Sequence, residues 1–152
     1  MKVFRSSDFL VLIRLIERLE RAFGLTADLY SSLDESKLTW RCANLPSNSF
    51  GKQAWCIIGA RESYFRAMKL GKWSGFSCSL NDVNEKTQVI SRLRATSKEI
   101  IDFIRTKEDT KECFGFMLDV LEHEIQHHGQ LIRYIYGNKL KFPESWNKRY
   151  TV

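Results

Sequence analysis

The chain has 152 residues, of which 43% are hydrophobic and 28% charged, and its formal net charge is +6 at pH 7. This length and composition predict one globular domain, residues 1–152, with a full hydrophobic core. Lys and Arg alternate with Asp and Glu along the chain, so we expect no specific nucleic-acid partner. The apolar run at residues 9–13 is short and ends at Arg14, so we expect neither a signal peptide nor a membrane span.

Four cysteines, Cys42, Cys56, Cys78 and Cys113, are spread along the chain without a C-x-x-C pair. A chain with a full core does not need disulfides to fold. We therefore expect reduced thiols and a cytoplasmic protein.

Helical periodicity begins at about residue 7 and continues to about residue 31. Residues 33–48 lack this period, and Pro46 marks a break in them. A second helical stretch runs from about residue 49 to 68, and Cys56 falls at the border of its apolar face. A cysteine at such a border is usually a small core residue, but it is also where a metal ligand would point obliquely into a helical bundle.

The connection at residues 70–83 has no helical period and is longer than connections usually are in helical bundles. A long connection permits a crossover, which leaves the helices before and after it parallel. We expect Trp73 and Phe76 to anchor this crossover on the bundle.

Two further helices are predicted, at about residues 85–106 and 111–136, and the aromatic tail at 142–147 is expected to pack over one end. No stretch alternates like a strand, so the predicted fold class is all-α, a four-helix bundle. Broad apolar faces on the first and fourth helices predict a homodimer. The apolar arc of the fourth helix comprises Phe114, Met117, Val120, Leu121, Ile125, Leu131, Ile132 and Ile135.

All three histidines lie in the fourth predicted helix. His123 and His127 are four residues apart, so their side chains share one face, with Cβ atoms about 5–6 Å apart. Two neutral imidazoles in this arrangement form a recurrent half-site for zinc and similar metals. The alternative is a pair of surface histidines without a metal. His128 falls among apolar neighbours, and we expect it to be a buried, hydrogen-bonded core residue.

The same stretch matches H-E-x-x-H, in which Glu124 would be the general base of a zinc peptidase. We rank this interpretation last, because a peptidase needs a further ligand and a substrate cleft, and the chain ends soon after His127. Glu124 lies about 100° round the helix from His123. Beside a metal at His123 and His127, we therefore expect Glu124 outside the ligand set or facing solvent.

Three stretches of the chain resemble the DinB/YfiT-like family. In the fourth helix, His123-Glu124-x-x-His127-x-Gly129-Gln130-Leu131 is similar to the family pattern H-x-x-x-H-x-G-Q-L. The other stretches lie at residues 47–64 and in the crossover at residues 71–76. The resemblance covers nearly the whole chain and implies a four-helix bundle with an up-down-down-up course.

The resemblance also implies a divalent metal, zinc or nickel, held by three histidines in many members of the family. Two of these carry over to His123 and His127. The third, on helix two, corresponds to Cys56, and the chain has no other histidine. Either the Cys56 thiolate completes a Cys-His₂ site, which zinc accepts, or the site is degenerate and binds metal weakly or not at all.

Family members include thiol-dependent S-transferases and isomerases, whose metal holds a cofactor thiol as a nucleophilic thiolate. The resemblance therefore implies a metal-dependent S-transferase or hydrolase with a small-molecule thiol or substrate as its partner. The alternative is a non-catalytic helical module for binding or dimerisation with a degenerate metal site.

Overall fold

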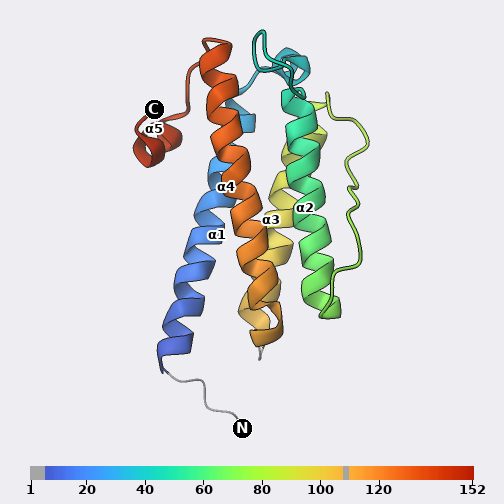
Figure 1. The fold of residues 1–152 in the computed structure, drawn as a ribbon, viewed down its shortest axis with the longest axis vertical. Helices are drawn as coiled ribbons and strands as arrows, with labels where there is room; N and C mark the ends of the chain where they lie inside the picture. Colours follow the sequence, from blue (N-terminus) through green and yellow to red (C-terminus); the bar gives the residue numbers. More distant parts are fainter. Residues whose placement is uncertain (1–5, 108–109) are drawn as a thin grey trace.

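The computed structural model describes residues 6–107 and 110–152, and these residues form helices and connections without any strand (Figure 1). The body consists of four long helices: α1 (Ser6–Ser32), α2 (Phe50–Leu70), α3 (Lys86–Thr106) and α4 (Phe114–Gly137). The shorter elements are two 3₁₀ turns, η1 (Glu35–Thr39) and η2 (Lys111–Cys113), and the helix α5 (Glu144–Tyr150). The prediction of an all-α protein is confirmed.

The four long helices lie side by side (Figure 1). In that view α1 and α4 run upward, whereas α2 and α3 run downward. Each long helix packs against two others: α1 and α2 each contact both α3 and α4. Because α2 is a direct neighbour of α4, residues on these two helices are able to form a joint site.

Residues 71–85 return along the outside of α2 from its lower to its upper end (Figure 1). The Phe76 ring packs directly over Gly59, where an added Cβ would lie 2.3 Å from Phe76 Cζ. The Trp73 ring packs against Tyr64, with ring centroids 5.0 Å apart. Both predicted anchors of this crossover therefore contact α2.

The ends of α2 follow local chemistry. Ser49 precedes the helix, and its side chain accepts a hydrogen bond from the Lys52 amide at 3.2 Å. The helix ends at Gly71, whose φ of 69° is left-handed and suits glycine. Ser49 and Gly71 thus define where α2, the helix that carries Cys56, begins and ends.

Two details of α4 and the tail differ from the sequence prediction. The helix begins at Phe114 because a 3₁₀ turn occupies Lys111–Cys113, and it includes Gly137, which the sequence predicted to follow it. The aromatic tail forms the additional helix α5. Its Trp146 is buried and donates from Nε1 to the Leu25 carbonyl at 2.6 Å, which docks α5 on α1.

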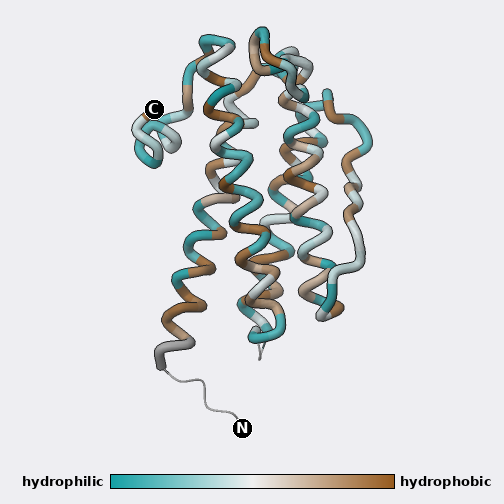
Figure 2. Tube along the Cα trace, viewed as in Figure 1, coloured by the Kyte–Doolittle hydropathy of each residue, from teal (hydrophilic) through white to brown (hydrophobic). Residues whose placement is uncertain are grey.

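Hydropathy alternates along each long helix (Figure 2), and the inward faces form two apolar clusters. One cluster includes Tyr30, Phe50 and Trp146, and the other includes Phe23 and Met117. Nine buried polar residues of the described chain belong to neither cluster, and five of them are linked by hydrogen bonds: Thr26, Arg61, Thr96, Glu124 and His128. No described helix is long and apolar enough to cross a membrane.

Candidate metal centre

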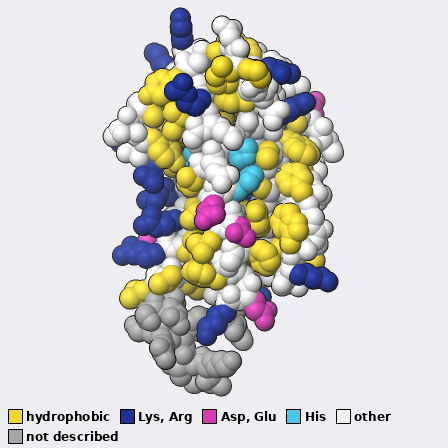
Figure 3. Space-filling model, in the orientation of Figure 1, with side chains coloured by type: hydrophobic (Ala, Val, Ile, Leu, Met, Phe, Trp, Pro, Cys, Tyr) yellow, Lys and Arg dark blue, Asp and Glu magenta, His cyan; other side chains and the backbone are white. Residues whose placement is uncertain are grey.

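Helices α2 and α4 bring three metal-ligating side chains together: Cys56 from α2, and His123 and His127 from α4. Their ligand atoms, one from each residue, all lie within 4.8 Å of one another. Cys56 Sγ is 3.7 Å from His123 Nε2, and the two imidazole centroids are 4.6 Å apart. The structure places this cluster on the flank of the bundle rather than at one end, and histidine side chains are visible at the surface there (Figure 3).

A tetrahedral zinc site requires particular separations between its ligand atoms. In a tetrahedral site with bonds of about 2.0–2.1 Å to nitrogen and about 2.3 Å to sulfur, ligand atoms stand about 3.3–3.6 Å apart. The sulfur–nitrogen distance of 3.7 Å is close to this range, and no pair of ligand atoms is more than 4.8 Å apart. Nitrogen and sulfur donors favour transition metals over magnesium and calcium, which prefer oxygen.

Gln53 fixes which nitrogen of His127 is free. Gln53 Oε1 accepts a hydrogen bond from His127 Nδ1 at 2.5 Å, while Gln53 Nε2 donates to the Tyr134 hydroxyl at 3.3 Å. Tyr134 in turn donates to the Asn48 carbonyl at 2.6 Å. The proton is thereby held on Nδ1, and the lone pair on Nε2 is available. Outer hydrogen bonds of this kind orient metal-binding histidines, and sequence reasoning did not identify Gln53.

His123 has fewer partners. Its Nε2 faces Cys56, and its Nδ1 is buried without a hydrogen-bond partner among the described residues. A buried polar atom without a partner is unfavourable by about 1–3 kcal/mol. His123 Nε2 is thus the nitrogen directed at Cys56, and the ring lacks the outer hydrogen bond that Gln53 gives to His127.

Burial keeps the imidazoles neutral, which is the form that binds metal. Burial, reinforced by the neighbouring His123, lowers the pKa of His127 to about 4, and burial also lowers the pKa of His123. Burial raises the pKa of the Cys56 thiol, so this group is protonated at neutral pH. A metal that binds here must displace that proton.

The inward face of α4 carries a different set of polar groups around Glu124, which is fully buried. Its carboxylate accepts hydrogen bonds from Arg61 Nε at 3.0 Å and from Arg61 Nη2 at 2.5 Å. Arg61 also donates to the Leu93 carbonyl at 2.9 Å and lies 4.2 Å above the Phe23 ring. Glu124 is therefore not solvent-facing, because the guanidinium on α2 compensates its buried charge.

Thr26 and His128 extend this network to α1 and α5. The Thr26 hydroxyl donates to Glu124, and His128 Nε2 lies 2.7 Å from that hydroxyl. His128 Nδ1 lies 2.6 Å from the Tyr150 hydroxyl. His128 therefore donates from Nε2 and accepts at Nδ1, and burial lowers its pKa to about 4. The prediction of a buried, hydrogen-bonded His128 is confirmed.

The buried pair argues against the H-E-x-x-H peptidase. Both carboxylate oxygens of Glu124 are bound by Arg61, and the side chain has no exposed surface. Burial alone would raise the pKa of Glu124, but the charge and hydrogen bonds of Arg61 outweigh it and lower that pKa. A carboxylate held in this way has no access to water beside His123 and His127.

The surface beside the Cys/His cluster is apolar on the α2 side. Trp55 precedes Cys56, and its ring packs against Phe76 with centroids 5.1 Å apart. Both rings are partly exposed. Figure 3 shows hydrophobic side chains beside the histidines and two acidic side chains just below them. The cluster thus opens onto a surface suited to the apolar part of a small molecule.

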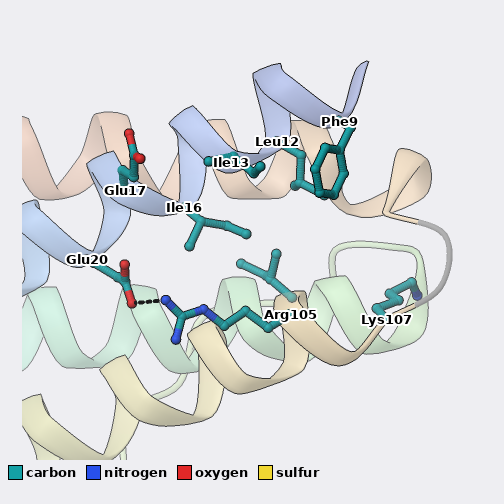
Figure 4. Close-up of a pocket in the computed structure, with 9 residues that line it drawn as sticks. Phe9, Leu12, Ile13, Ile16, Glu17, Glu20, Arg105 and Lys107 are labelled. Atoms are coloured by element: carbon teal, nitrogen blue, oxygen red, sulfur yellow. Dashed lines mark hydrogen bonds and ion pairs between the residues drawn. The ribbon is translucent and has the colours of Figure 1, made fainter. Parts of the chain in front are cut away.

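A separate apolar groove of about 530 Å³ lies between α1 and the end of α3 (Figure 4). It is lined by residues such as Leu12, Ile16 and Ile104, and Arg105 binds Glu20 at 2.7 Å at its edge. None of its lining residues belongs to the Cys/His cluster. The groove therefore does not serve as a substrate pocket for that cluster.

A scan of the chain against protein-family models finds no match, and a search of curated proteins finds none either. The resemblance to the DinB/YfiT-like family therefore rests on the motifs in the sequence.

Proposed function

We propose that the protein is a DinB/YfiT-like metal protein in which Cys56, His123 and His127 hold a divalent cation, zinc or nickel. The observation that carries this proposal is the meeting of three ligand atoms within 4.8 Å, although Cys56 and His123 are 67 positions apart in the chain. The donor set supports a transition metal. The directions of the four long helices in Figure 1 are consistent with the up-down-down-up bundle of that family.

On this proposal the protein is a metal-dependent transferase or hydrolase, with thiol-dependent S-transfer as the favoured reaction. The bound metal supplies a Lewis acid, which lowers the pKa of a thiol or water. Three protein ligands leave one tetrahedral position for that external group. Gln53 keeps His127 Nε2 directed for binding, and Trp55 and Phe76 provide an apolar surface for the organic part of a substrate. The charge of a Cys56 thiolate reduces the Lewis acidity of the metal.

The second candidate is a non-catalytic helical module with a degenerate metal site. Two observations favour it: the raised pKa of Cys56, which opposes thiolate formation, and the open apolar groove between α1 and α3. For either candidate we propose a homodimer formed through apolar helix faces. The four free cysteines accord with a cytoplasmic location.

The metal content of purified, untagged protein distinguishes the two candidates. We expect near-stoichiometric zinc or nickel in the wild type and a large loss in His127→Ala and in Cys56→Ala. Gln126→Ala, an exposed change on the same helix, is the matched control and should keep the metal. Equal metal content in wild type and His127→Ala would reject the Cys-His₂ site and leave the non-catalytic module.

A further inference from the structure

The pair Arg61–Glu124 joins the same two helices that carry the Cys/His cluster. Arg61 lies on α2 with Cys56, and Glu124 follows His123 on α4. We propose that this buried ion pair is the positioning element of the cluster, because it sets the rotation and register of α4 against α2. The inference rests on the proposed function in one respect: it takes the cluster to be a metal site.

The geometry of the pair restricts both distance and direction. Two hydrogen bonds, from Arg61 Nε at 3.0 Å and from Arg61 Nη2 at 2.5 Å, engage the two oxygens of the Glu124 carboxylate. A fork of this kind has a preferred plane, whereas apolar contacts tolerate rotation. The pair therefore holds α4 at one angle relative to α2.

The Arg61 side chain is held in place by contacts with residues of other helices. Its backbone belongs to α2, its Nη1 donates to the Leu93 carbonyl of α3 at 2.9 Å, and its guanidinium lies 4.2 Å above the Phe23 ring of α1. The side chain is fully buried. The Glu124 carboxylate thus packs into a buried site, here called the socket, formed by Arg61 and the residues that hold it.

Helical geometry connects this socket to the cluster. Successive residues are about 100° apart, so His123 and His127 both lie on one side of Glu124, about 100° and 60° round the helix. His128 lies about 40° round on the other side, where it meets Thr26 at 2.7 Å. With Glu124 in its socket, the two imidazoles must face Cys56. A rotation of one residue would turn them away.

The decisive variant replaces both partners with apolar residues, Arg61→Met together with Glu124→Leu. Such replacements of buried ion pairs often preserve stability, so the urea midpoint of the metal-free protein is expected to stay close to wild type. Cobalt(II), used as the probe, is expected to bind about 10- to 100-fold more weakly, the range found when support for metal ligands is lost, because α4 would no longer hold the two imidazoles at a fixed angle to Cys56. The thiolate-to-cobalt absorption band, which reports Cys56 as a ligand, should weaken as well.

Two further variants complete the set. Arg61→Lys retains the charge and removes the fork, so it should fold and still bind cobalt more weakly than wild type. It takes the place of the double variant if that one does not fold. The matched control is Glu20→Gln with Arg105→Gln, which removes an exposed ion pair between α1 and α3. This control should leave cobalt affinity and spectrum unchanged.

A disulfide-trapping experiment tests positioning without any metal. His123→Cys places a thiol on the side of α4 that faces Cys56, whose sulfur lies 3.7 Å from Nε2 of the native imidazole. A cysteine is shorter than a histidine, so the crosslinking rate depends on how closely α4 holds this position to α2. With the Arg61–Glu124 pair intact, oxidised glutathione should crosslink Cys56 to the introduced thiol, and peptide mass spectrometry detects the product. With Arg61→Met and Glu124→Leu added, crosslinking should be about tenfold slower.

The outcomes separate the two proposals. Failure of wild type to bind cobalt would reject the metal site, and the crosslinking rates would then decide the positioning role alone. The inference would be overturned if the folded double variant bound cobalt with wild-type affinity, or if it crosslinked as fast as the protein with the intact pair. In that case the pair serves only the stability of the bundle. Arg61→Lys replaces the double variant in this comparison if the double variant does not fold.

Discussion

Two pairs of polar residues with the same four-residue spacing lie one position apart on α4, and their surroundings are opposite. His123 and His127 face Cys56 on the flank, and His123 Nδ1 has no hydrogen-bond partner among the described residues. Glu124 and His128 face inward, and every polar side-chain atom of theirs is hydrogen-bonded. The first pair has the properties of a ligand site, and the second those of a structural network.

The contrast teaches that four-residue spacing identifies a pair on a helix but not its role. The role depends on what the neighbouring helix presents. On α2, Cys56 lies opposite the first pair, whereas Arg61 lies opposite the second. About 1.4 turns of α2 therefore separate Cys56, which is able to bind a metal cation, from Arg61, which is itself a cation.

The largest difference between the two faces is expected in stability. His128→Ala should lower the free energy of unfolding by about 3 kcal/mol, because it leaves a cavity beside Trp146 and removes the partner of the Thr26 and Tyr150 hydroxyls. His123→Ala, at a half-buried position, should lower it by about 1 kcal/mol or less. Urea unfolding of metal-free protein measures both. Equal losses would remove the distinction between the faces.

Lowering the pH should destabilise the protein through His128, which is buried and neutral in the folded state. The pKa of His128 is about 4 in the folded protein, against an ordinary value of 6.5. The unfolded chain therefore binds the proton first, and His128 should lower stability by about 1.5 kcal/mol between pH 6.5 and 5. His127, whose pKa is also about 4, should add a loss of similar size in metal-free protein.

Urea midpoints across this pH range, measured with chelator present, test the effect. His128→Gln should show a shallower dependence than wild type. Glu124 does not contribute in this window, because its pKa is lowered below 4.5. A wild-type stability that is constant between pH 6.5 and 5 would contradict a neutral buried His128.

A smaller effect is expected where α5 joins the network. Tyr150→Phe removes the hydroxyl 2.6 Å from His128 Nδ1, which should lower the free energy of unfolding by about 1 kcal/mol. Tyr136→Phe, at an exposed ring, serves as the control and should have no effect. If thermal unfolding shows the same midpoint for Tyr150→Phe and wild type, α5 is held by Trp146 rather than by the network.

The smallest effect concerns Gly129 on the exposed side of α4. An added Cβ there meets no atom within 4 Å, so Gly129→Ala should raise stability by up to about 1 kcal/mol through helix propensity. Gly115→Ala, equally unobstructed on the same helix, should behave alike. A lower stability of either variant, measured by urea unfolding, would contradict this expectation.

Helix positions were largely predictable because helical periodicity is a local property of the sequence. The third helix was predicted at about residues 85–106 and is found at Lys86–Thr106. The start of α4 was predicted three residues too early, at about residue 111. Residues 111–113 form a 3₁₀ turn, which helical periodicity does not distinguish from an α-helix over so short a stretch. The helix α5 escaped prediction because it is short and depends on docking Trp146 beside Leu25.

Hydrophobicity gave the wrong orientation for two neighbouring residues of α4. The apolar arc was predicted to include Ile125, yet this side chain is 40% exposed, while the charged Glu124 is completely buried. The pattern of apolar residues along α4 carries no information about a buried arginine on another helix. Only the packing of α2 against α4 reveals that Arg61 makes this position the favourable one for a carboxylate.

By itself, the sequence determined the all-α class, the paired histidines on one helical face and the position of Cys56 at the border of another apolar helical face. Each of these follows from residue type and helical spacing. The tertiary structure alone decided that Cys56 lies 3.7 Å from His123, that Gln53 orients His127, and that Glu124 is buried against Arg61. These contacts join residues far apart in the chain, so they depend on how α2 packs against α4, which helical periodicity does not encode.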